Sequence, residues 1–131
     1  MQRIAILLLF VLVTGCSSGK SLDELQERGG VYYPVNDPNP YSGKVNGETS
    51  GHYGRVKYEF TTVDGKKHGM ETYWFKSSGK KYHETHWKNG KKDGLETQWW
   101  PNGQKAIESN WKNGKRVGQM STWSKDGVKL N

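Results

Sequence analysis

The sequence predicts an all-β fold, an elongated single-layer antiparallel meander of β-hairpin repeats of about 24 residues each. The first observation is that columns of identical residues recur every 24 or 25 positions: Gly54, Gly79, Gly103 and Gly127; Gly65, Gly90 and Gly114; Trp74, Trp99 and Trp123. The second is that Asp-Gly and Asn-Gly pairs, which tolerate the positive φ of tight hairpin turns, punctuate each repeat. Between these pairs lie runs of five to nine residues rich in Trp, Tyr, Thr and Val, which is typical of strands.

Alternation along the predicted strands assigns their side chains to faces, because successive residues of a strand point to opposite sides. The alternation places the aromatic residues on one side of the sheet. That side is expected to hold Val56, Tyr58, Phe60, Lys81, His83, Trp87, Lys105, Ile107 and Trp111 together with Trp74, Trp99 and Trp123. The opposite side is expected to hold Lys57, Tyr82 and Ala106 with Glu59, Glu84 and Glu108, the three glutamates pairing with lysines across the strands.

Composition limits how much of the chain can be buried. The 131 residues are only 32% hydrophobic, which argues against a thick two-layer core, and much of that apolar content lies in residues 1–15. The formal net charge is +7, and its excess lies in the repeated half: residues 64–131 hold fourteen Lys or Arg against seven Asp or Glu. We therefore expect one repeat domain over residues 31–131, basic along much of its length.

Residues 1–15 are predicted to be a signal peptide. The apolar run from Ile4 to Val13 is too short to span a membrane and has the length of a secretory signal core. It ends in LVTGC, which resembles a bacterial lipobox. The resemblance implies cleavage before Cys16 and lipidation of Cys16, and because Ser17 is not an aspartate it implies the outer membrane, facing the periplasm. The alternative is an ordinary signal peptide followed by a free cysteine; a lone cysteine in either case excludes an internal disulfide.

Residues 16–30 are predicted to be a polar tether that contains a short helix. Ser21 and Glu24 have the spacing of a capping box, and the glycine pair at 29–30 would end the helix. An extended segment follows, because its prolines remove backbone donors. Its first residues, Val31, Tyr32 and Tyr33, can pack on the first repeat as a lid.

The phrases GKKHGMETYWFKSSGKKYHE, GKKDGLETQWWPNGQKAIES and GKRVGQMSTWSKDGVK, preceded by PYSGKV, resemble the variant MORN repeat of bacterial proteins. The resemblance covers residues 31–131. It implies an elongated antiparallel sheet that acts as an adaptor or associates with membranes, in a family often described as antitoxin-like. A lipobox departs from what a cytoplasmic antitoxin would carry.

The sequence offers no constellation for catalysis, a metal or a cofactor, and we expect no enzymatic activity. His83 and His86 flank Glu84, but strand residues three apart point to opposite faces, so the two imidazoles should not converge on a metal. The repeated glutamates occupy equal positions in each repeat, which favours structural ion pairs. No serine has a histidine and carboxylate at a spacing that indicates a nucleophile.

A binding surface is the remaining hypothesis. The turns carry Lys66, Lys67, Lys91, Lys92, Lys115 and Arg116, about two cations per repeat, and we group them with Trp74, Trp99 and Trp123 as the candidate site. Solubility alone is the alternative explanation of the lysines. An anionic lipid, an anionic glycan or a protein partner would fit such a surface, whereas the export signal argues against nucleic acid.

The sequence therefore predicts a lipid-anchored envelope protein that acts as a non-catalytic binding or scaffold module. The alternative is an antitoxin or immunity-like protein that neutralises a toxin by binding it. Lys125 and Lys129 on the last strand discourage edge-to-edge pairing, so we expect a monomer.

Overall fold

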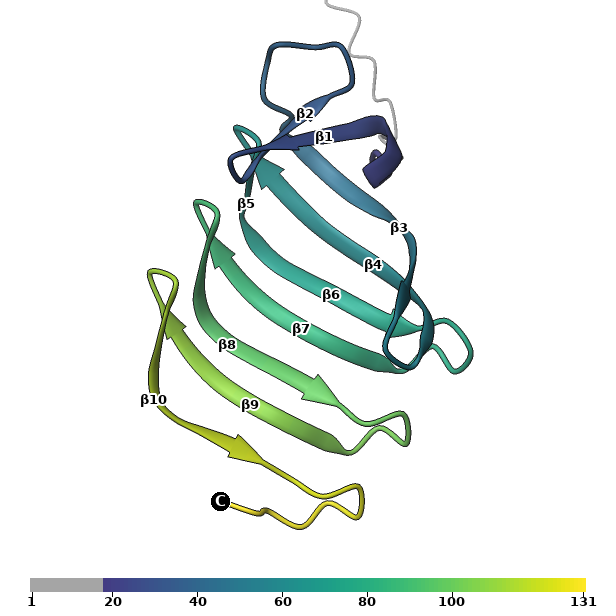
Figure 1. Ribbon diagram of the computed structural model, residues 1–131, viewed down its shortest axis with the longest axis vertical. Helices are drawn as coiled ribbons and strands as arrows, with labels where there is room; N and C mark the ends of the chain where they lie inside the picture. The colour runs from purple at the N-terminus through teal and green to yellow at the C-terminus, as the bar shows by residue number, and fades with distance from the viewer. Residues whose placement is uncertain (1–17) are drawn as a thin grey trace, which may run out of the picture.

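The protein folds as one open antiparallel sheet with a small hairpin on it, as the computed structural model in Figure 1 shows. The structure describes residues 18–131; the signal-peptide and Cys16 lipidation predictions lie outside this range. The large sheet contains β3 (Gly43–Gly51), β4 (Gly54–Val63), β5 (Lys66–Lys67), β6 (Gly69–Phe75), β7 (Lys81–Lys88), β8 (Lys91–Trp99), β9 (Lys105–Lys112) and β10 (Lys115–Thr122). Its order is β3-β4-β6-β7-β8-β9-β10, with β5 beside β4. The predicted all-β meander of hairpins is confirmed.

The connections on one side of the sheet are the tight turns that the Asp-Gly and Asn-Gly pairs predict. At Asp64-Gly65, Asn89-Gly90 and Asn113-Gly114 both residues have positive φ, the conformation of a type I′ hairpin turn. Figure 1 shows these three turns following one another along the same side of the sheet. The connections on the other side, after β6 and β8, are longer and place a single glycine, Gly79 or Gly103, at positive φ.

The two faces of the sheet both carry aromatic residues, so the prediction of a single aromatic face is wrong. Cross-strand partners share a face, and Tyr58 opposes Tyr73 while Lys57 opposes Trp74. We call the inner face the side that holds Val45, Tyr58, Phe60, Glu71, Tyr73, His83, Thr85, Trp87, Glu96, Ile107 and Trp111. The outer face holds Glu59, Thr72, Trp74, Glu84, Thr97, Trp99, Glu108 and Trp123.

Irregularities in register explain the other wrong face assignments. The register shifts where Tyr73 and Trp74 oppose His83 and Lys81, and it shifts again where Gln98 and Trp99 oppose Ile107 and Lys105. Each shift inserts one extra residue, which reverses the alternation beyond it. Lys81 and Lys105 consequently join the tryptophans of the outer face, while Tyr82 packs on Phe75 of the inner face with ring centroids 5.2 Å apart.

Residues 18–30, the described part of the predicted tether, are more ordered than a tether. Residues 22–24 form a single 3-10 turn, η1 (Leu22–Glu24), and the backbone N–H of Ser21 donates to the Glu24 carboxylate at 2.8 Å, as a capping box requires. The chain then continues into β1 (Leu25–Arg28), which pairs with β2 (Val31–Pro34). The glycine pair at 29–30, expected to end a helix, instead lies in the turn between these two strands.

The β1–β2 hairpin packs on the inner face and forms the main core with it. The buried residues Leu25, Val45, Tyr58 and Phe60 make one cluster, and Tyr32 packs on Phe60 with ring centroids 5.5 Å apart. The predicted lid of residues 31–33 is therefore present through Tyr32. In Figure 1 the hairpin crosses the sheet near β3 and β4 and leaves β7 to β10 uncovered.

Among residues 18–131 there is no helix with the length and hydropathy that a membrane span requires. The last strand, β10, forms one edge of the sheet, and the C-terminal residues return along part of it. Trp123 bridges to Lys129, and the Asn131 side chain accepts from the Thr122 N–H at 2.8 Å and donates to the Met120 carbonyl at 3.1 Å. Asn131 thus satisfies backbone groups that an added strand would otherwise use.

Candidate binding cleft and cationic ridge

The structure places the cationic turns and the tryptophans of the predicted site at opposite ends of the strands. Lys91 begins β8 and Trp99 ends it, so about eight residue steps of roughly 3.3 Å put them some 26 Å apart. The same arrangement holds in the neighbouring repeats, where Trp74 is the next-to-last residue of β6 and Trp123 directly follows β10, each at the strand end away from the cationic turn. The tryptophans and the turn lysines therefore cannot contact one small ligand together.

The two basic residues of each turn also differ in environment. Lys67 and Lys92 lie on the inner face and are paired, Lys67 with Glu71 and Lys92 with Glu96, each at 2.5 Å. Lys66 and Lys91, which directly precede them, and Lys115, at the same position of the third turn, are exposed and have no carboxylate within 4.0 Å in the described part of the chain. Lys67 and Lys92 are structural, and the free charge of each turn belongs to its neighbour.

A further cation, which sequence reasoning missed, belongs to the same row. Lys88 ends β7 directly opposite Lys91, and Lys112 ends β9 directly opposite Lys115. Like charges in direct cross-strand register are destabilising. Lys112 is offset by Asp93 at 3.1 Å, whereas Lys88 has no carboxylate partner within the described residues.

Arg116 completes this row. It occupies the repeat position of Lys67 and Lys92, but the position of Glu71 and Glu96 is Met120 in the last repeat, so its guanidinium stays exposed. We call the set Lys66, Lys88, Lys91, Lys115 and Arg116 the cationic ridge. It lies along the side of the sheet that carries the three tight turns (Figure 1).

The inner face beside the ridge is held by a ladder of cations, carboxylates and aromatic rings. Lys67 lies over the rings of Phe60 and Trp87, at 4.5 and 5.0 Å from their centroids. Glu71, only 4% exposed, accepts from Lys67, from the Trp87 indole N–H at 2.8 Å and from the Tyr73 hydroxyl at 3.1 Å. Burial, together with the charge and hydrogen bond of Glu71, raises the pKa of Tyr73 well above its usual value.

The next repeat builds a second rung of the same kind. Glu96, 9% exposed, accepts from Lys92 and shares a hydrogen bond with His83 Nε2 at 2.9 Å, while Lys92 lies 4.6 Å from the Trp111 ring centroid. Burial of Glu96 acts to raise its pKa, but the hydrogen bonds and charges of His83 and Lys92 outweigh it and hold that pKa at about 2. Trp111, unlike Trp87, has a buried indole N–H with no hydrogen-bond partner among residues 18–131.

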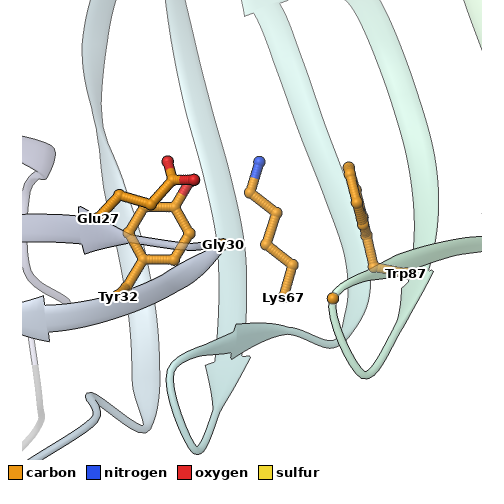
Figure 2. Close-up of a pocket in the computed structure, with 6 residues that line it drawn as sticks. Glu27, Gly30, Tyr32, Lys67 and Trp87 are labelled. Carbon is orange, nitrogen blue, oxygen red and sulfur yellow. The ribbon is translucent and has the colours of Figure 1, made fainter.

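A cleft opens where the β1–β2 hairpin meets this ladder. Its volume is about 310 Å³, and Glu27, Gly30, Tyr32, Lys67, Trp87 and Gly90 line it. Figure 2 shows the rings of Tyr32 and Trp87 on either side of Lys67, with the Glu27 carboxylate beside Tyr32. Burial, and then the charge of Glu27, raises the pKa of Tyr32 to about 12, so its hydroxyl is a neutral donor at physiological pH.

The cleft and the ridge are continuous. Gly90 lines the cleft, and the side-chain stem of Lys66 passes over it, 3.5 Å from where a Cβ on Gly90 would lie. Lys91 follows Gly90 directly. A ligand in the cleft therefore lies next to two ridge cations.

The outer face carries the predicted tryptophan row as a separate feature. Trp74, Trp99 and Trp123 are half-buried and lie one hairpin apart, with Lys81 at 5.8 Å from the Trp99 ring centroid and Lys105 at 5.0 Å from that of Trp123. The repeated glutamates pair with these lysines: Glu84 with Lys81 at 2.5 Å and Glu108 with Lys105 at 2.6 Å. These two pairs run along one strand, so the cross-strand pairing predicted for all three glutamates is found only for Glu59, which meets Lys44 of β3 at 3.1 Å.

The described residues include no group of three or more His, Cys, Asp or Glu side chains placed to hold a metal ion. His83 and His86 diverge, since His83 contacts Glu96 while His86 Nδ1 contacts the Leu95 carbonyl at 3.0 Å. The arrangement offers charge and aromatic surface for binding.

Comparisons of the chain with protein-family models, with curated proteins and with solved structures return no match.

Proposed function

We propose that this chain is a non-catalytic binding or scaffold module of the cell envelope, and that the cationic ridge is its binding edge. The observation that carries the proposal is the like-charged register of Lys88 with Lys91, which no carboxylate of the described residues offsets; Lys112 has the same register with Lys115 but is paired with Asp93. Such pairs lower the stability of a sheet. A solubilising role would be served equally well by staggered lysines, whereas a binding role requires the charges to be concentrated.

The contrast within each turn supports the same proposal. A ligand for the ridge needs cations that are not already neutralised, and the sheet supplies them beside cations that are. Lys67 and Lys92 are held by glutamates and aromatic rings, whereas Lys66 and Lys91 extend into solvent. An exposed cation that is concentrated with others raises the local concentration of an anionic partner.

We propose further that the module is a lipoprotein, anchored through Cys16 in the outer membrane and facing the periplasm. The lipobox-like LVTGC and the apolar run before it support this anchor. Acyl chains hold a protein on a bilayer by roughly 0.8 kcal/mol per buried methylene, so the ridge itself need not supply membrane affinity. The repeat pattern that resembles MORN arrays supports an adaptor role.

The test is a crosslinking capture of tagged, natively lipidated protein from fractionated membranes. A ridge variant replaces Lys66, Lys88, Lys91, Lys115 and Arg116 by glutamine. A control variant makes the same change of charge at the opposite ends of the strands, at Lys57, Lys76, Lys80, Lys125 and Lys129.

We expect the wild type and the control variant to capture the same envelope component and the ridge variant to lose it. Capture that is equal for the ridge and control variants would refute the binding edge. A captured toxin whose activity the protein suppresses would instead establish the antitoxin-like alternative.

A further inference from the structure

We propose that the cationic ridge and the Tyr32–Trp87 cleft form one site for a linear acidic polysaccharide. The ridge would hold the carboxylates of the chain, and the cleft would hold one of its sugar rings. This inference rests on the proposed function and specifies the chemistry of its partner.

The spacing of the ridge favours an extended, regularly charged chain. Lys66, Lys91 and Lys115 each follow a tight turn, and successive turns are two strands apart. With neighbouring strands separated by roughly 4.8 Å, successive lysines recur about every 10 Å. A compact acidic ligand reaches one of these positions, whereas a linear polymer whose carboxylates repeat along its length reaches all three.

The chemistry of the cleft favours a sugar ring over an anionic group. The charge of Lys67 is already balanced by Glu71, and Glu27 adds a carboxylate to the lining, so the cleft is not a pocket for an anion. What remains is a pair of aromatic walls, with the Lys67 ammonium as a donor between them and the Glu27 carboxylate as an acceptor beside Tyr32. The apolar face of a pyranose packs on such walls, and its hydroxyls donate to the Glu27 carboxylate and accept from the Lys67 ammonium.

The continuity of the two parts distinguishes this ligand from a lipid surface. Lys66 and Lys91 flank the cleft at Gly90, so a chain can pass from the ridge into the cleft without crossing the hairpin. A bilayer carrying anionic headgroups would meet Glu27 beside those lysines, and the like charges would repel. An acidic glycan instead places the hydroxyls and the apolar face of a sugar ring beside Glu27, while the carboxylate of that ring points to Lys66 or Lys91.

The experiment is calorimetric titration of the full-length, natively purified protein in neutral detergent with two linear polyuronates, polygalacturonate and alginate, and with neutral dextran. We expect at least one polyuronate to bind and dextran not to bind. The ridge variant should lose about tenfold or more in affinity, because it removes several ion pairs between the exposed ridge cations and the carboxylates of the polyuronate. The matched control variant should lose much less. Equal losses in the two variants, or no binding of either polyuronate, would overturn the proposal.

Glu27→Ala removes both the charge and the acceptor oxygens of Glu27, and the binding hypothesis and simple electrostatics predict opposite effects for it. Removing an exposed carboxylate increases the affinity for any polyanion that binds by charge alone. If the carboxylate accepts a sugar hydroxyl, the substitution instead weakens polyuronate binding, which is the expected result. Unchanged or tighter binding would remove the cleft from the site and overturn the proposal.

Vesicles of phosphatidylglycerol and phosphatidylethanolamine complete the test. Binding to these vesicles that matches polyuronate binding and depends equally on the ridge would overturn the glycan assignment in favour of a lipid surface. Capture of an envelope protein through the ridge without polyuronate binding would refute this inference and leave the proposed function standing. If neither polyuronate binds and the ridge captures no envelope component, both this inference and the proposed function are refuted.

Discussion

Replacing Glu96 by glutamine isolates the contribution of charge to the inner-face ladder. Glutamine keeps an oxygen that can accept from Lys92 and from His83 but removes the negative charge. The folded-state pKa of Glu96 is about 2 against 4.5 for the free side chain, a difference that corresponds to about 3 kcal/mol. Screening by solvent at this open sheet reduces the expected loss of stability to about 2 kcal/mol at pH 7.

The pH dependence follows from the direction of that pKa change. A carboxyl with a lowered folded-state pKa contributes its full stability above 4.5, where both states are ionised, and loses it as the pH falls towards 2. Urea unfolding followed by tryptophan fluorescence at pH 7 and at pH 3 measures this directly. The difference between wild type and Glu96→Gln should be about 2 kcal/mol at pH 7 and clearly smaller at pH 3.

Glu108→Gln is the matched control, because Glu108 also pairs with a lysine at 2.6 Å but is more exposed. An exposed pair contributes about 0.5 kcal/mol, and its removal should change little at either pH. If the two substitutions cost the same at pH 7, or if the cost of Glu96→Gln does not decrease at pH 3, the ladder is not the electrostatic support that the geometry indicates.

Three further predictions concern other parts of the chain. Gly65→Ala should lower the free energy of unfolding by about 3 kcal/mol in thermal or urea unfolding, because Gly65 has φ +72° and an added Cβ would lie 2.4 Å from a methyl group of the β1–β2 hairpin. Gly54→Ala is the control; its Cβ would meet open space, and it should cost about 1 kcal/mol. Met120→Glu should restore the carboxylate of the earlier repeats beside Arg116 and raise stability by up to about 1 kcal/mol, and an unchanged unfolding midpoint would contradict this. Asn131→Ala should uncover the edge of β10 and produce a concentration-dependent dimer in sedimentation velocity, where the wild type stays monomeric; a wild-type dimer would refute the edge argument.

The repeat period and the turns were predictable because each depends on local chemistry. Asp64-Gly65, Asn89-Gly90 and Asn113-Gly114 favour positive φ wherever they occur, and the runs between them are long enough to form strands. The faces were not predictable to the same degree. An irregularity such as that at Tyr82 adds one residue and inverts the alternation, and its position is set by cross-strand register that a single strand does not reveal.

The candidate site was predictable only in part, for a related reason. The cationic turns are visible as a run of lysines, but their division into paired and free cations depends on glutamates four residues later that only the folded inner face brings into use. Sequence spacing does contain this signal, since Lys67 and Glu71 recur as Lys92 and Glu96. The cleft carries no such signal, because Glu27 and Gly30 were assigned to a tether and Tyr32 to a lid, and no spacing in the sequence places them beside Trp87.

The two adjacent lysines of the first and second turns therefore have different roles: one supports the fold, and the other provides free charge. Strand alternation sends the second lysine to the inner face, where a glutamate and a tryptophan hold it, and leaves the first one free in solvent. Lys88 and Lys91 stand in like-charged register directly beside this ladder, and we infer that its ion pairs offset the destabilisation that the register causes. In the last repeat Met120 stands at the position of the glutamate, so Arg116 is not held in an inner-face ion pair. It adds a second exposed cation to the ridge at this turn. We infer that the last repeat, which lacks the full ladder, contributes to ligand contact what it no longer contributes to stability.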